Sequence, residues 1–84
     1  MGYRLMVDLD VVDALDRLPP KVRTRLLVHF GKLRAFPDDL SDYHENDRTG
    51  RRIEISIFAG YAIHYWIDFA DRHVKVLELR RALN

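Results

Sequence analysis

The stretch that decides the fold is residues 51–69, which read RRIEISIFAGYAIHYWIDF. Apolar and polar residues alternate on both sides of Ala59-Gly60, as they do in strands that bury one face. Ala59-Gly60 supplies a turn between the two runs, so the stretch predicts a β-hairpin. The odd-numbered residues from Ile53 to Phe69 are apolar or aromatic. We expect this set to face the core and the even-numbered residues to face away from it.

The residues before the hairpin begin with a strand and a helix. Residues 3–7 alternate in polarity, which predicts a short strand. Either Asp8 or Asp10 can accept the first free N–H groups of a helix. Apolar residues then recur at helical spacing up to Leu18.

The rest of the chain completes an α+β pattern. Pro19-Pro20 ends the first helix, and residues 21–36 carry one broad apolar stripe that predicts a second helix. Residues 38–47 are acidic with little periodicity, and we expect a loop. Residues 74–81 predict a last strand. The order is β-α-α-β-β-β: an antiparallel sheet, joined along one side by the N-terminal strand, with a two-helix hairpin packed on one face.

Composition narrows the class of protein. The chain has 84 residues, of which 48% are hydrophobic, and we expect a single domain over residues 1–84. With no Cys, neither disulfides nor thiolate metal sites can form. The N-terminus lacks the apolar region of a signal peptide and no apolar run reaches the length of a membrane span, so we expect a cytoplasmic protein that does not contact a membrane.

Charge is strongly segregated along the chain. The formal net charge is only +1, yet residues 21–36 hold five basic residues and no acid, and residues 37–47 hold five acidic residues and no Lys or Arg. A solvated helix face and a solvated loop explain both blocks. The basic segments also leave nucleic-acid binding open. His44, Glu45 and Asp47 are weak candidates for a metal site, so we expect no metal and no cofactor.

Several short motifs resemble one protein family. They are Gly50-Arg51-Arg52-Ile53-Glu54-Ile55, Gly60-Tyr61-Ala62-Ile63-His64-Tyr65, a second helix that ends at Pro37, and a last strand that ends in Arg80-Arg81. Together with the element order, they resemble the RelE/ParE toxin superfamily. The resemblance implies a bacterial toxin of a type II toxin–antitoxin pair, with a cognate antitoxin protein as its partner. RelE-like members cleave mRNA on the ribosome, and ParE-like members bind DNA gyrase.

Two positions depart from the RelE-like pattern. Ser56 and Ala62 stand where the resemblance implies Arg. A cleavage site in this chain would therefore be atypical. The alternative is a non-catalytic binding module on the same fold, either a ParE-type gyrase inhibitor or an inactive toxin that only binds its antitoxin. A monomer and a homo-oligomer both stay open.

The candidate site combines proton transfer with phosphate binding. A metal-independent ribonuclease needs a base, a proton donor and cations that face the phosphate. We expect His64, Glu54 and Arg81 to be catalytic, with cross-strand pairing that brings Glu54 near His64 on the face opposite the core. We expect four further residues to bind RNA: Arg51, Arg52, Trp66 and Arg80. The simpler interpretations are a Glu54–Arg52 pair on the sheet and a Trp66 that anchors a protein partner.

Overall fold

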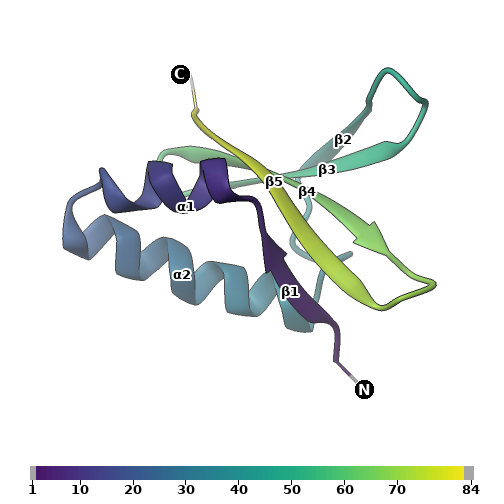
Figure 1. Cartoon of the computed structure of the whole chain (residues 1–84), viewed down its shortest axis with the longest axis horizontal. Coiled ribbons are helices and arrows are strands. Elements are labelled where there is room, and N and C mark those ends of the chain that lie inside the picture. The colour runs from purple at the N-terminus through teal and green to yellow at the C-terminus, as the bar shows by residue number, and fades with distance from the viewer. Residues whose placement is uncertain (1, 83–84) are drawn as a thin grey trace.

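The computed structural model describes residues 2–82. The elements, in chain order, are β1 (Arg4–Val7), α1 (Leu9–Asp16), α2 (Pro20–Ala35), β2 (Tyr43–Asn46), β3 (Arg52–Phe58), β4 (Tyr61–Asp68) and β5 (His73–Arg81). Both helices lie on the same side of the sheet (Figure 1). The predicted α+β class and its β-α-α-β-β-β core are confirmed. Neither helix in the described part of the chain has the length and apolar character to span a membrane.

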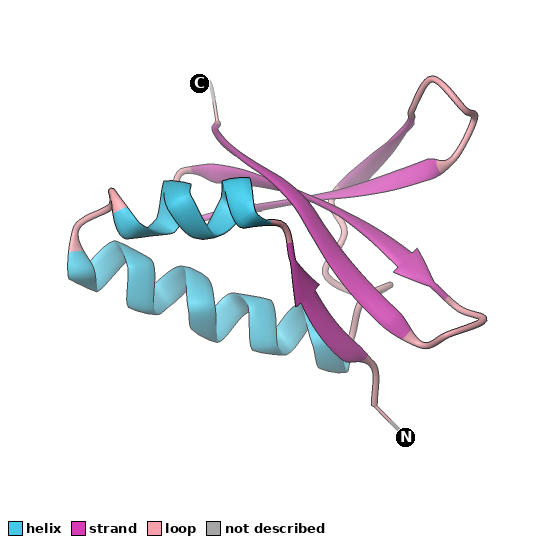
Figure 2. Ribbon diagram, viewed as in Figure 1, coloured by secondary structure: helices cyan, strands magenta, loops and turns pink. Residues whose placement is uncertain are grey.

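The sheet is mixed, which differs from the expected antiparallel sheet. Its five strands follow the order β1-β5-β4-β3-β2 (Figure 2). β1 pairs with β5 in parallel, and the other pairs are antiparallel. A tight turn forces its two strands to be antiparallel, but β1 and β5 are connected through the rest of the fold. No local turn therefore sets the direction of β1 relative to β5. The alternation of polarity in residues 3–7 predicts a strand but not its direction.

The edge strand β2 corrects a second expectation, because it lies inside the stretch predicted to be a loop. Its four residues are all exposed. The strand pairs with β3, with Tyr43 opposite Ile55 and Asn46 opposite Arg52. Since neither face of β2 is buried, its sequence lacks the apolar alternation that marks a half-buried strand. Hydrogen bonding to β3, rather than side-chain burial, defines this element.

The helices are positioned by their termini and by the core. Asp8 caps α1 by accepting a hydrogen bond from the Asp10 N–H at 3.2 Å, which decides between the two predicted caps. On α2, Leu26, Phe30 and Leu33 are fully buried against the sheet. Burying a side chain of this size contributes about 1.5–3 kcal/mol. This stripe holds α2 on one side and leaves the other side of the sheet free of helices.

The turn between β3 and β4 determines which residues share a face. Ala59 and Gly60 have φ values of 52° and 83°, and they form a two-residue turn that pairs Phe58 with Tyr61. An even-numbered residue of β3 therefore lies opposite an odd-numbered residue of β4. Because cross-strand neighbours share a face, the even-numbered residues of β3 face the helices. The expectation that its odd-numbered residues face the core is wrong, and it is correct for β4.

Candidate active site

A cleft of about 370 Å³ lies on the face of the sheet away from the helices, which we call the outer face. Three predicted site residues line it, namely His64, Arg80 and Arg81. His64 lies on β4 opposite Ile55 of β3, so its side chain belongs to the outer face. The cleft also contains residues that were not expected at the ribonuclease site: Tyr43 and Glu45 of β2, and Ile57 of β3.

The carboxylate beside His64 is Glu45. Its Oε1 atom lies 3.8 Å from Nδ1 of His64. The His64 side chain is 10% exposed and that of Glu45 is 59% exposed, so the imidazole is sheltered while the carboxylate reaches solvent. A carboxylate at Nδ1 can orient an imidazole and leave Nε2 for proton transfer. The sequence suggested Glu45 only as a weak metal ligand and did not place it beside His64, because residues 38–47 were expected to be a loop.

Glu54 does not lie near His64, and the prediction that these two residues pair is wrong. Glu54 lies opposite Tyr65 on the helix side and is buried. It accepts hydrogen bonds from Ser41 Oγ at 2.7 Å and from Arg52 Nε at 2.5 Å. Burial opposes ionisation of Glu54, but these hydrogen bonds outweigh it and hold its pKa below the usual value. Of the two arrangements expected for Glu54, a pair with His64 or a pair with Arg52, the structure has the pair with Arg52. Arg52 therefore contacts Glu54 and does not line the cleft.

Trp66 and Arg51 contact each other on the outer face. The Arg51 guanidinium lies over the Trp66 ring, 4.6 Å from its centroid, and the Lys75 ammonium lies 4.7 Å from the same point. Arg51 also pairs with Asp47 at 3.0 Å. Cation–π contacts of this kind hold the tip of the β2–β3 hairpin against β4 and β5. A nucleobase that stacks on Trp66 would have to displace one of these cations.

The two arginines at the end of β5 differ in their surroundings. Arg80 lies opposite Ala62 on the outer face, and its Nε donates to Glu78 Oε1 at 2.6 Å. The hydrogen bond and the charge of Glu78 raise the pKa of Arg80 above its usual value. Arg81 lies opposite Tyr61, and its guanidinium is 5.7 Å from the Tyr61 ring centroid. Both arginines line the cleft, but Arg80 is paired with a carboxylate whereas Arg81 lies near an aromatic ring.

Comparison with solved structures places this geometry in a known fold. No protein-family model and no curated protein sequence matches the chain. The RelE–RelB complex of the archaeon Pyrococcus horikoshii OT3 superposes with a TM-score of 0.80 and 26% identity over 96% of each chain. The RelBE2 toxin–antitoxin complex of Mycobacterium tuberculosis gives a TM-score of 0.83 and 18% identity over 98% of this chain and 100% of that one. The chain has a RelE-like toxin fold.

The Escherichia coli toxin RelE, solved in the free state as a double arginine-to-alanine mutant, has the same fold. It gives a TM-score of 0.67 and 19% identity over 98% of this chain and 85% of that one. The resemblance to RelE toxins noted in the sequence is therefore confirmed at the level of the fold. At these identities the superposition does not transfer residue roles, so the site in this chain must be argued from its own residues.

The two departures from the RelE-like motif lie on opposite faces of this sheet. Ser56 is buried on the helix side, where its Oγ lies 2.9 Å from Nε2 of His29 on α2. Burial lowers the pKa of His29, so this imidazole is held neutral. Ala62 lies in the cleft beside Arg80. Of the two positions, only Ala62 can add a side chain to the outer face.

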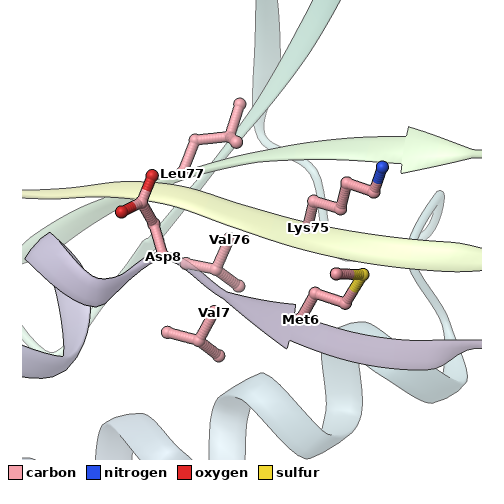
Figure 3. Close-up of a pocket in the computed structure, with 6 residues that line it drawn as sticks. All are labelled: Met6, Val7, Asp8, Lys75, Val76 and Leu77. Carbon is pink, nitrogen blue, oxygen red and sulfur yellow. The ribbon is translucent and has the colours of Figure 1, made fainter.

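Two other hollows in the described residues lack the imidazole that the outer-face cleft contains. The hollow between β1 and β5, about 210 Å³, shows how the two faces separate (Figure 3). There Val7 and Val76 point toward α2, whereas Met6, Lys75 and Leu77 point away from it. A larger hollow of about 440 Å³ opens over the first turns of α2, beside Lys21, Thr24 and Arg25. Neither hollow is lined by a histidine, although Asp8 and Lys75 both line the hollow between β1 and β5.

One group of potential metal ligands lies outside the cleft. Asp68, Asp71 and His73, at the β4–β5 turn, have ligand atoms within 4.8 Å of one another. The Lys75 ammonium already lies 3.7 Å from Asp68 Oδ2 and supplies a positive charge there. The weaker candidates in the sequence, His44 and Glu45, face opposite sides of the sheet because they are neighbours along β2.

Proposed function

We propose that the chain is the toxin of a type II toxin–antitoxin pair and cleaves mRNA at the outer-face cleft. Its RelE-like fold supports the toxin assignment. Two of the similar structures are complexes of a RelE toxin with its antitoxin, and this supports a cognate antitoxin as partner. Cleavage on the ribosome follows from the same resemblance.

The observation that carries the cleavage proposal is the His64–Glu45 pair beside Arg80. Attack of a ribose 2′-hydroxyl on the adjacent phosphate requires a base for that proton and a donor for the leaving oxygen. Negative charge that builds on the phosphate requires a positioned cation. The cleft brings an imidazole and two guanidinium groups together within one hollow.

Each cleft residue then has a defined role. His64 transfers the proton, since an imidazole can both accept and donate a proton and is the commonest general acid–base group in enzymes. Glu45 orients the imidazole through Nδ1, a role that the sequence assigned to Glu54. Arg80 and Arg81 bind the phosphate, because a guanidinium offers paired donors to phosphate oxygens. Tyr43, half exposed on β2, offers a ring on which a base can stack.

RNA that extends beyond the cleft would follow the outer face. Arg51 and Trp66 lie on this face, and we retain them as contacts for the RNA strand outside the cleft. Arg52 and Glu54 are bonded to each other on the helix side, so they have no part in the proposed site.

The test is induction of the full chain in cells, with mRNA 5′ ends, translation and DNA supercoiling measured together. We expect new mRNA ends and arrested translation with the parent protein, and neither with His64→Gln or Arg80→Ala. Co-expression of a small protein encoded beside the gene should suppress the effect. Altered supercoiling without new mRNA ends would identify a ParE-type gyrase inhibitor instead. Antitoxin binding without any toxicity would identify a non-catalytic module.

A further inference from the structure

We propose that Glu78 sets the affinity of the cleft for RNA by occupying Arg80 in place of a phosphate. Glu78 is then a residue that a bound phosphodiester must displace. The inference rests on the proposed function, because it takes Arg80 as part of the phosphate site.

The geometry places Glu78 beside the cleft, next to two of the residues that line it. Glu78 lies directly opposite His64 across the β4–β5 pair, and Arg80 lies opposite Ala62. Residues two apart on a strand share a face, so Glu78 and Arg80 are neighbours on the outer face. The Arg80 Nε to Glu78 Oε1 distance of 2.6 Å is that of a short charge-assisted hydrogen bond. The guanidinium that should meet the phosphate is thus already bonded to a carboxylate.

The balance of charge around the cleft also indicates that Glu78 weakens RNA binding. Glu45, Arg80 and Arg81 line the cleft, and Glu78 pairs with Arg80 at its edge, so these two carboxylates offset the two guanidinium charges when His64 is uncharged. A phosphate arriving at Arg80 is repelled by Glu78 and must compete with it for the same donors. Free RNA should therefore bind weakly.

The exposure of the pair shows that the exchange is feasible. The side chains of Arg80 and Glu78 are 63% and 45% exposed, so neither is held by surrounding protein. Ion pairs exposed to this degree are weak and readily exchange partners. A carboxylate and a phosphodiester both accept the paired donors of a guanidinium, which lets one replace the other. Arg80 can thus move from Glu78 to a phosphate without rearranging the fold.

The experiment measures the Kd of a short single-stranded RNA with 2′-O-methyl riboses, which cannot be cleaved, by fluorescence anisotropy at low salt. Glu78→Gln removes the competing charge and keeps the shape of the side chain. We expect it to bind this RNA about 2–5 times more tightly than the parent, the range that an exposed ion pair supports. Asp13→Asn is the matched control, because it removes one exposed carboxylate from α1 on the other side of the sheet.

A double-mutant cycle separates the pair from general charge. In the Arg80→Ala background, Glu78→Gln should no longer tighten binding. An equal gain from Glu78→Gln and Asp13→Asn, or a gain that persists without Arg80, overturns the inference. If Arg80→Ala and His64→Gln leave both RNA binding and cleavage unchanged, the proposed function itself fails. If Arg80→Ala weakens binding but Glu78→Gln does not tighten it, only the role of Glu78 is lost.

Discussion

On the helix side of β3 the polar side chains are themselves buried, whereas the charged pair on the outer face of β5 is exposed to solvent. Ser56 is buried against His29, and Glu54 is buried against Ser41 and Arg52. On the outer face, Arg80 pairs with Glu78 and both side chains are largely exposed. A polar group on the helix side therefore contributes to the fold, and one on the outer face stays available to a ligand.

The difference explains why polarity alone does not identify the site. Glu54 and Glu45 are both carboxylates on neighbouring strands, and both have a cationic or imidazole partner. Removing a buried acceptor leaves its donors unsatisfied, while removing an exposed one lets water replace it. The following variants test this separation between a structural face and a functional face, beginning with the largest expected effect.

Phe30→Ala should lower the free energy of unfolding more than any other variant proposed. Phe30 is fully buried in the core between α2 and the sheet. Truncating a buried Phe costs about 3–5 kcal/mol of the free energy of unfolding. Urea denaturation followed by circular dichroism measures the loss. Phe69→Ala, at an exposed site, should change the same quantity by less than about 0.5 kcal/mol. Similar losses in the two variants would contradict the core described here.

His64→Gln should abolish most of the cleavage and leave the fold intact. A lost proton-transfer group slows such a reaction by about 100-fold or more. The rate on an RNA oligonucleotide measures this, and the urea midpoint shows that folding is retained. A variant that cleaves at the parent rate would exclude His64 as the catalytic group.

Glu54→Gln and Glu45→Gln make the same substitution on opposite faces. Glu54→Gln should lower the free energy of unfolding by about 1–3 kcal/mol, because a buried charged acceptor is lost. Glu45→Gln should change it by less than about 1 kcal/mol, since Glu45 is exposed, but it should slow cleavage. Denaturation and cleavage assays on both variants show which carboxylate stabilises the fold and which one supports cleavage. The reverse result would make Glu54 the functional carboxylate.

The same Glu54 variant predicts a difference in acid stability. The folded-state pKa of Glu54 lies below its unfolded value, so the unfolded chain binds the proton more readily. Its stabilisation is complete above the unfolded pKa, about 4.3, and is lost as the pH falls through the folded pKa. Between pH 6 and pH 3 the parent should therefore lose more stability than Glu54→Gln. Parallel losses in urea titrations would contradict this.

His29 should make stability depend on pH in a milder range. Burial lowers the pKa of His29 in the folded state, so the unfolded chain takes up the proton first as the pH falls. The free energy of unfolding should decline below pH about 6.5, by at most about 1.4 kcal/mol per pH unit from this group. His29→Gln should flatten the curve between pH 7.5 and 5.5. A variant with the parent's slope would exclude His29 as the cause.

Ala62→Arg should have the smallest effect. It adds a positive charge to the cleft and so tests whether the cleft binds phosphate. Ala62 lies opposite Arg80 in the cleft, so a second guanidinium there can share a phosphate with it. We expect RNA affinity to rise about fivefold, equivalent to about 1 kcal/mol. Ala35→Arg adds the same charge at an exposed position of α2. Unchanged affinity in Ala62→Arg, measured at low salt, would mean that the cleft is not a phosphate site.

Local pattern was enough to predict much of the fold. The Asp8 cap, the break at Pro19-Pro20, the apolar stripe of α2 and the β3–β4 hairpin depend on residues close together in the chain. Residue type, strand alternation and the family resemblance also suggested His64, Arg80 and Arg81, and all three line the outer-face cleft. Their roles in cleavage stay a prediction. The pairing of Phe58 with Tyr61 follows from a two-residue turn, so counting residues across that turn would have placed Glu54 on the correct face.

The sequence by itself determined both helices and four of the five strands, because capping, proline geometry and apolar periodicity act over a few residues. Only the tertiary structure decided that β1 runs parallel to β5, that residues 43–46 join the sheet, and that Glu45 rather than Glu54 lies beside His64. These contacts join residues far apart in the chain. These contacts are stabilised by strand pairing and burial in the assembled sheet. Neither effect produces an apolar periodicity within the segments, so the sequence pattern does not reveal them.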